Sequence, residues 1–246
     1  MLTHQTVTKL GDLGLGAMAG ALADQLERPG PWADLAFEDR LGLLVDREAD
    51  ARDSRALTRR LKTAKLRYPA SVEDLDLRAP RGLDRSVIAH RAGAAWVANG
   101  HNLIVTGPTG VGKSYLACAL ANSALRAGHT AYYTRAGRLL DDLAIGRADG
   151  RYARLLTSLA KVSLLVLDDF LLTPATIEAC RDLLEVVEDR AGRRSTLVAS
   201  QLPVDNWHAA MADPTLAEAL LDRVLASSHR ITMKGPSMRR RQPDQP

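Results

Sequence analysis

One glycine-rich segment constrains this chain more than any other feature. Residues 107–114 read Gly-Pro-Thr-Gly-Val-Gly-Lys-Ser, and a glycine followed by four residues and Gly-Lys-Ser is typical of loops that bind phosphate. The glycines let backbone N–H groups approach phosphate oxygens closely, because glycine adopts positive φ at little cost. An apolar segment precedes the loop and a helical pattern follows it, the order that such a phosphate site requires. The segment therefore predicts a nucleotide-binding domain.

The residue types in this segment predict individual roles. Lys113 is expected to reach the β- and γ-phosphates of ATP and to act in catalysis, and the Ser114 hydroxyl is expected to ligate Mg²⁺. ATP and Mg²⁺ are therefore the expected cofactors. The predicted nucleotide-binding residues of the loop are Gly107, Pro108, Thr109, Gly110, Val111, Gly112, Lys113 and Ser114.

Two acids follow an apolar segment at residues 164–167, which has the composition of a buried strand. Asp168 and Asp169 would then lie at the carboxyl edge of the sheet, beside the phosphate loop. We expect Asp168 to hold Mg²⁺, directly or through water, and Asp169 to orient or deprotonate the attacking water. A solvated capping acid is the alternative interpretation of Asp169.

Three more polar residues are candidates, each with an alternative. Ser200 and Gln201 follow a predicted strand at residues 195–200, where a side chain can meet the γ-phosphate; they could equally be turn residues before Pro203. Arg223 lies on a predicted helix and could contact the γ-phosphate held by a neighbouring subunit. The alternative for Arg223 is a surface ion pair with a nearby acid such as Asp222.

Short apolar runs alternate with helical patterns from about residue 102 onward, which indicates a parallel sheet covered on both faces. The predicted fold class is α/β: a P-loop NTPase sheet flanked by helices, with a small all-helical N-terminal module. The predicted strands cover residues 103–106, 130–134, 164–167, 195–200 and 229–233. The predicted domains are a module over residues 1–68, an ATPase domain over 69–234 and a basic tail without regular structure over 235–246.

Three helical segments are expected in the N-terminal module. The first carries Leu10 to Leu26 and ends at Pro29, the second carries Leu35 to Val45, and the third covers about residues 54–67. Basic side chains gather on the third segment and again between the second and third strands, where they suit a nucleic-acid backbone or a solvated face. The predicted DNA-contacting residues are Arg52, Arg55, Arg59 and Lys62 in the first cluster and Arg147, Arg151 and Arg154 in the second.

Composition adds weaker constraints. The formal net charge is +4, which favours a polyanionic partner without requiring one. Cys118 and Cys180 have no metal-ligand spacing, so we expect reduced, buried thiols. The start of the chain has no signal-peptide pattern, and no window approaches the roughly 20 apolar residues that cross a bilayer. We therefore expect a soluble cytoplasmic protein without a membrane partner.

At this level of detail the sequence resembles the IstB-like ATPases, which are transposition helpers of insertion sequences and relatives of the helicase loader DnaC in the AAA+ superfamily. The similarity extends over nearly the whole chain and does not depend on a single motif. The matching stretches are residues 72–75, 81–84, 104–114, 133–135, 164–169, 200–203, 213–217, 222–223 and 234–239.

The resemblance implies an AAA+ ATPase that forms a homo-oligomer with ATP at subunit interfaces, binds and bends duplex DNA, and directs a cognate transposase to its target. It implies that Arg223 is an arginine finger, that Gln201 is a first sensor of nucleotide state and that Arg239 is a second. It also implies that residues 137–158 are an insertion facing nucleic acid. A DnaC-like helicase loader and a non-hydrolysing ATP-bound DNA scaffold are the alternative functions.

One position departs from the family pattern. Where the family usually has glycine after the aromatic residue that follows the acids, this chain has Leu171 after Phe170. Leucine adopts positive φ only at a cost, so we expect a different local turn and an altered geometry at Asp169. Such a change would slow ATP hydrolysis without preventing ATP binding.

Overall fold

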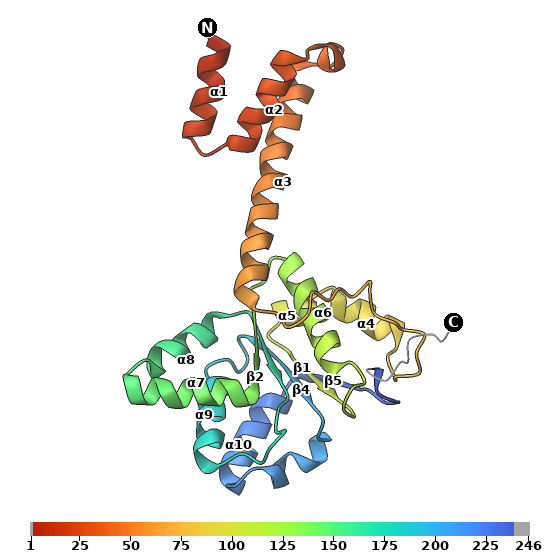
Figure 1. Cartoon of the computed structure of the whole chain (residues 1–246), viewed down its shortest axis with the longest axis vertical. Coiled ribbons are helices and arrows are strands. Elements are labelled where there is room, and N and C mark those ends of the chain that lie inside the picture. The colour runs from red at the N-terminus through yellow and green to blue at the C-terminus, as the bar shows by residue number, and fades with distance from the viewer. Residues whose placement is uncertain (1, 239–246) are drawn as a thin grey trace, which may run out of the picture. The chain divides into compact units, whose positions relative to one another are not determined.

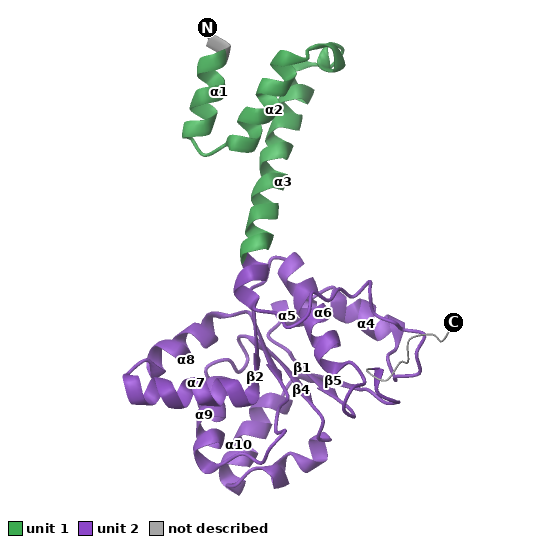
Figure 2. Cartoon of the chain, viewed as in Figure 1, with its two compact units in different colours: residues 1–59 green, residues 60–246 purple. Residues whose placement is uncertain are grey.

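The computed structural model describes residues 2–238 and divides the chain into two compact units, Met1–Arg59 and Arg60–Pro246 (Figure 2). The sequence pattern predicts a boundary between residues 68 and 69. The observed boundary falls inside a helix, α3 (Phe37–Ala64), so the last turns of that helix belong to the larger unit.

The smaller unit contains α1 (Leu2–Asp12), α2 (Gly16–Glu27), a 3₁₀ turn (Gly30–Trp32) and most of α3. Two helix predictions are corrected here. The first predicted segment is two helices, because the chain breaks at Gly14, whose φ is +74°. The second and third predicted segments are one helix, because no glycine or proline occurs between Val45 and Ser54 and the Glu48–Arg52 pair, at 3.0 Å, supports the helix across that stretch.

The larger unit is built on a five-stranded parallel sheet (Figure 1). The strands are β1 (Asn102–Thr106), β2 (Ala131–Arg135), β3 (Leu164–Asp168), β4 (Ser195–Ser200) and β5 (Ser228–Thr232). Their order in the sheet is β2-β3-β4-β1-β5, and every neighbouring pair is parallel. All five predicted strands are confirmed to within one residue at each end, and so is the predicted fold class.

Helices cover both faces of this sheet. The remaining helices are α4 (Arg85–Ala92), α5 (Ala95–Ala98), α6 (Lys113–Arg126), α7 (Ala136–Asp149), α8 (Tyr152–Lys161), α9 (Ile177–Glu188) and α10 (Pro214–Leu225), with 3₁₀ turns at Val204–Asn206 and His208–Ala210. The predicted insertion at residues 137–158 is formed by α7 and α8. Side chains of α7–α10 pack on Ile104, Leu165, Leu167 and Val198 of the sheet. Helix α6, which follows the phosphate loop, packs against β1, β2, β3 and β4.

Strands β1, β3 and β4 are buried at every residue, as expected for a sheet covered on both faces. Cys118 and Cys180 are buried free thiols, as predicted. Among residues 2–238, no helix is both long and apolar enough to cross a lipid bilayer.

Candidate nucleotide-binding site

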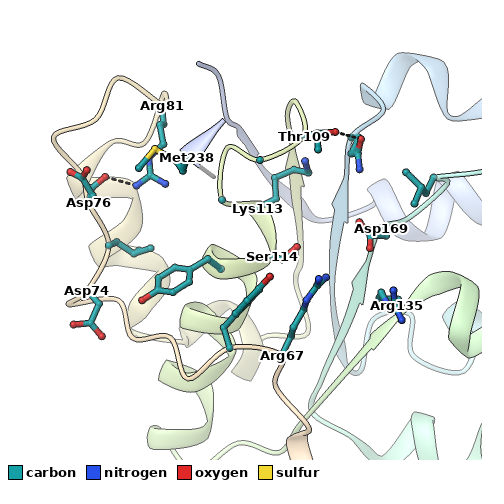
Figure 3. Close-up of a pocket in the computed structure, with 17 residues that line it drawn as sticks. Arg67, Asp74, Asp76, Arg81, Thr109, Lys113, Ser114, Arg135, Asp169 and Met238 are labelled. Atoms are coloured by element: carbon teal, nitrogen blue, oxygen red, sulfur yellow. Dashed lines mark hydrogen bonds between the residues drawn. The ribbon is translucent and has the colours of Figure 1, made fainter. Parts of the chain in front are cut away.

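The strand order brings three predicted site segments to one edge of the sheet. Because β4 lies between β1 and β3, the loop after β1, Gln201 after β4 and Asp169 after β3 are neighbours at the carboxyl ends of their strands. They open into a cleft of about 510 Å³, which also holds Lys113 and Ser114 (Figure 3). The sheet topology thus assembles one site from residues that lie far apart in the sequence.

Glycine is required in the phosphate loop for steric as well as conformational reasons. Gly107 has a φ of +149° and Gly112 a φ of +102°, in the region that side chains avoid. A Cβ at Gly107 would collide with the carbonyl oxygen of Met233, and one at Gly112 would lie 2.9 Å from Nη1 of Arg81. The loop is therefore packed against the chain on both sides as well as shaped for close approach to a ligand.

Lys113 folds back over its own loop. Its ammonium group donates hydrogen bonds to the carbonyl oxygens of Gly107, at 2.8 Å, and Pro108, at 2.9 Å. The side chain is buried but still lines the cleft. Of the other predicted loop residues, Thr109, Gly110, Gly112 and Ser114 line the cleft, whereas Val111 is fully buried and Pro108 is exposed.

The Asp168 carboxylate is buried and held in one orientation. One oxygen accepts a hydrogen bond from the backbone N–H of Asp169, at 3.0 Å, and the other accepts the hydroxyl of Tyr133, at 2.5 Å. Burial, followed by the Asp168 contact, raises the pKa of Tyr133 well above its ordinary value, so the hydroxyl keeps its proton and acts as a donor. Sequence reasoning missed Tyr133 because a tyrosine in an apolar strand suggests only core packing.

Arg67 is a second residue that the sequence interpretation missed. Its guanidinium lies 4.0 Å from Asp168 and interacts with the Tyr133 hydroxyl, which is the main reason that the pKa of Arg67 is raised. Arg67 lines the cleft and points toward it in Figure 3, and Arg135 at the end of β2 also lines the cleft. No motif covers Arg67, because it lies in the segment that precedes the sheet.

The turn after the two acids corrects one expectation. Leu171 adopts a φ of +53°, the conformation in which glycine was expected, and Asp169 also has a positive φ, +54°. The expectation that Leu171 avoids positive φ is therefore wrong, whereas the altered geometry at Asp169 stays a prediction. Leu171 is buried with Phe170 in a core cluster, and burying a leucine is worth about 1.5–3 kcal/mol, which offsets a left-handed cost of about 1–2 kcal/mol.

The structure separates the two candidate sensors at the end of β4. Ser200 is fully buried and donates a hydrogen bond to the carbonyl oxygen of Phe170, at 2.7 Å, which ties β4 to the turn after β3. Gln201 lines the cleft and accepts a hydrogen bond from Thr109 of the phosphate loop. Only Gln201 is therefore placed to meet a ligand in the cleft.

Arg81 and Met238 line the cleft and also hold the phosphate loop in place (Figure 3). The buried guanidinium of Arg81 donates to the carbonyl oxygens of Val111, at 3.2 Å, and Asp76. The backbone N–H of Met238 donates to the carbonyl oxygen of Gly110, at 2.9 Å. The first four residues of the predicted tail, 235–238, thus pack on the phosphate loop. Arg239 lies outside the described residues.

Arg223 lies at the opposite edge of the sheet from the phosphate loop. Its carbonyl oxygen accepts a hydrogen bond from the Asn102 side chain, at the amino end of β1, whereas the loop follows the carboxyl end of that strand. The Arg223 guanidinium forms ion pairs with Glu188 and Asp222 and is one-third exposed. Arg223 is thus separated by the length of β1 from the site of its own chain.

Several of the predicted DNA contacts have partners within the protein. Arg52 and Arg55 both pair with Glu48 at 3.0 Å. Arg147 pairs with Asp182 and stacks over the ring of Tyr152. The remaining residues of the two sets are Arg59 and Lys62 on α3, Arg151, which pairs with Asp149, and the exposed Arg154.

Known sequences match this chain over nearly its full length. The model of the family described as IstB-like ATP binding protein matches residues 8–245. A protein of Sinorhizobium fredii named as an insertion-sequence ATP-binding protein, y4pL, is 47% identical over 98% of this chain and 98% of its own. The protein named as the ATP-binding protein of insertion sequence IS1162 from Pseudomonas fluorescens is 48% identical over 87% and 93% of the two chains.

Solved structures share the fold of the larger unit. The crystal structure of DnaI aligns with a TM-score of 0.56 at 22% identity, over 69% of this chain and 90% of its own. The DnaC helicase loader aligns with a TM-score of 0.53 at 19% identity, over 70% and 100%. DnaA bound to AMPPCP and single-stranded DNA aligns with a TM-score of 0.54 at 15% identity, over 70% and 52%.

Proposed function

The chain belongs to the IstB-like ATP-binding protein family, and from this membership we propose that it is an ATP-hydrolysing helper of an insertion-sequence transposase, acting on duplex DNA. One observation carries the proposal: Lys113, Ser114, Asp169 and Gln201 line one cleft, and the buried Asp168 is hydrogen-bonded to the backbone of Asp169. The relatives matched over nearly all of the chain are named as ATP-binding proteins of insertion sequences.

The donors at this site suit a magnesium–triphosphate complex. The Ser114 hydroxyl and the Asp168 carboxylate are the oxygen ligands that Mg²⁺ prefers. No group of three His, Cys, Asp or Glu side chains with metal-binding geometry occurs in the described part of the chain, so phosphate oxygens and water would complete the coordination. When bound, the ion would neutralise charge that develops on the transferring phosphoryl group.

The protein side chains then have distinct tasks in hydrolysis. Lys113 holds the terminal phosphates, Asp169 orients or deprotonates the attacking water, and Gln201 contacts the γ-phosphate end while hydrogen-bonded to Thr109. Arg223 reaches the site of a neighbouring subunit and stabilises the charge of the transition state there. Its place at the far edge of its own sheet supports action in trans and argues against action in cis.

Duplex DNA and the transposase are the proposed macromolecular partners. The basic side chains on α3 and on the α7–α8 insertion would contact the phosphate backbone of DNA. Such contacts attract the protein to DNA without recognising the base sequence. ATP at the subunit interfaces would stabilise an oligomer on the target, and loss of the γ-phosphate would weaken it. This cycle would regulate where the transposase acts.

Multiple-turnover phosphate release, with and without duplex DNA, tests the proposal. We expect turnover that depends on Mg²⁺, rises with duplex DNA and is lost in Lys113→Ala. ATP binding without turnover under both conditions would instead support the ATP-bound scaffold.

A helicase loader is the second candidate, favoured by the fold shared with DnaI and DnaC. Affinities for duplex and single-stranded DNA of equal length, measured at one salt concentration, separate the two functions. Tighter binding of the duplex is expected; a preference for single strands would favour the loader.

A further inference from the structure

We propose that Arg67 binds the terminal phosphate of the nucleotide held by its own chain and makes the site select triphosphate over diphosphate. This inference rests on the proposed nucleotide function and concerns a residue outside its motifs. Arg67 follows the last turn of α3 and lies in the segment that leads to the sheet.

Arg67 lies close to Asp168, one of the proposed metal ligands. Nη1 of Arg67 lies 4.0 Å from Oδ2 of Asp168, the oxygen that also accepts the Tyr133 hydroxyl at 2.5 Å. In the proposed complex Asp168 and Ser114 would hold the metal ion, which would neutralise charge on the terminal phosphates. A guanidinium beside Asp168 is therefore at the terminal-phosphate end of the cleft, where ATP and ADP differ.

The Arg67 guanidinium also has N–H donors that can bind a ligand. Arginine has five N–H donors in a planar fork and stays protonated. Its Nη1 lies 4.0 Å from Asp168, and the Tyr68 ring lies 5.3 Å from the guanidinium. The side chain is nevertheless 39% exposed and lines the cleft with Lys113 and Ser114, so donors are available to a phosphate oxygen.

The contacts of Arg67 with Asp168 and the Tyr68 ring favour an orientation that faces the cleft before a ligand binds. An arginine whose orientation is favoured in this way loses less side-chain entropy on binding than a fully solvated one. A charge-assisted hydrogen bond from such a group to a phosphate is among the strong ones. Its effect should appear mainly in triphosphate affinity, because a diphosphate has no group at that position.

Equilibrium titration with two fluorescent nucleotides, an ADP analogue and a slowly hydrolysed ATP analogue, tests this role in the full-length protein with Mg²⁺. Arg67→Ala should weaken binding of the triphosphate by about tenfold or more and leave the diphosphate within about twofold. Arg67→Lys, which keeps the charge but not the fork, should fall in between. Arg126→Ala, which removes an arginine that pairs with Glu73 on the surface of the same unit, is the matched control and should change neither affinity.

Tyr133→Phe is a second test that leaves Arg67 in the chain and removes one of its contacts, together with the hydroxyl that orients Asp168. A loss shared by both nucleotides would therefore report on Asp168, and only a change in the ratio of triphosphate to diphosphate affinity would report on Arg67. The variant should reduce selectivity for the triphosphate by less than Arg67→Ala does. Equal losses for both nucleotides in Arg67→Ala and Arg67→Lys, or no loss in either, would overturn the inference while leaving the nucleotide function intact. Wild-type protein that binds neither nucleotide would refute the nucleotide function itself, and the role of Arg67 with it.

Discussion

At the scale of single residues, the site depends on side chains that hold other groups in place. Asp168 is oriented by Tyr133 and by the backbone of Asp169, and the phosphate loop is held by Arg81. None of these supports belongs to the phosphate-binding motif. They matter because a binding site works only when its ligand-contacting groups are already positioned.

At Leu171 we expect a glycine substitution to destabilise the protein less than an alanine substitution, the reverse of what is usual within helices and strands. Leu171→Gly loses burial but relieves a left-handed residue, whereas Leu171→Ala loses burial and keeps the strain. We expect the glycine variant to be more stable than the alanine variant by about 1 kcal/mol. Urea unfolding of both variants measures this difference, and an alanine variant equal to or more stable than glycine would contradict the strained turn.

Arg81 gives a second prediction at this scale. Arg81→Met leaves the carbonyl oxygens of Val111 and Asp76 without this donor, and an unsatisfied buried acceptor costs about 1–3 kcal/mol. The phosphate loop should loosen, and ATP affinity should fall by about tenfold. Nucleotide titration checks this, with Arg78→Met, at an exposed position nearby, as the control. Unchanged affinity in Arg81→Met would show that the loop keeps its shape without this support.

At the scale of elements, the packing of helices depends on a few buried polar groups. Glu48 on α3 accepts hydrogen bonds from the backbone N–H groups of Ala17 and Met18 at the start of α2. These are N–H groups that a helix leaves without intrahelical partners. A side chain on one helix thus caps another, which no local sequence pattern reveals.

Glu48→Gln should therefore lower the thermal stability of the helical unit in a pH-dependent way. Burial raises the pKa of Glu48, but hydrogen bonds from the N–H of Met18 and the side chain of Arg52 outweigh it and lower the pKa below the ordinary 4.5. A lowered acid pKa stabilises the fold above pH 4.5, and this contribution is lost as the pH falls through the lowered value. Far-UV circular dichroism melts should separate wild type from variant at pH 7 and converge in acid. Glu38→Gln, in the first turn of α3, is the control.

Arg190, which follows α9, joins the end of α8 to β4 inside the larger unit. Its guanidinium donates to the carbonyl oxygen of Val162, at 2.9 Å, to that of Ser195 and to the hydroxyl of Thr196, at 3.2 Å. Burial, with a smaller effect of Arg194, lowers the pKa of Arg190 to about 9, so the group is still charged at neutral pH. Its donors link the end of α8 to β4 beside the core strand β3.

Arg190→Met should destabilise the larger unit by about 2–4 kcal/mol, because several buried acceptors lose their donor. The exposed Arg193→Met is the matched control and should stay within about 0.5 kcal/mol of wild type. Urea denaturation gives both values. Equal stability of the two variants would mean that water or rearrangement satisfies the acceptors.

At the scale of the whole molecule, the distance between Arg223 and the phosphate loop has a consequence for assembly. If each site combines the loop of one chain with Arg223 of another, two inactive variants should complement each other. Mixing Lys113→Ala with Arg223→Ala in equal amounts creates some junctions that have both residues. About a quarter of wild-type ATPase activity is expected from random mixing at each junction.

Steady-state phosphate release from the mixture, compared with each variant alone, measures this complementation. Nucleotide binding by Arg223→Ala alone should match wild type, since Arg223 is remote from its own cleft. A mixture as inactive as its components would argue against a shared site. An Arg223→Ala variant with full turnover by itself would remove Arg223 from catalysis altogether.

The sequence alone determined the parts of this protein that local chemistry dictates. The five strands, the phosphate loop and the acids after β3 could be predicted because burial on both faces selects continuous apolar strands, and close phosphate approach selects glycine. Chain breaks at Pro29 and Gly30 were also visible. Helix boundaries were less predictable: α3 was divided in two because its middle is polar on most sides, although nothing there breaks a helix.

Only the tertiary structure decided which of these residues meet. The order β2-β3-β4-β1-β5 brings Gln201 beside the phosphate loop, which cannot be read from sequence spacing. Arg223 lies at the far edge for another reason, because it is in the last turn of α10, just before the parallel strand β5. Arg67 and Glu48 belong to no motif, and Arg81 and Tyr133 lie in stretches that resemble the family without indicating a role. Each of the four acts through a partner distant in the chain. Leu171 shows the same limit: its backbone preference opposes the observed turn, and burial against residues far along the sequence outweighs it. Local propensity is a property of neighbouring residues, whereas burial and hydrogen bonding depend on the whole fold.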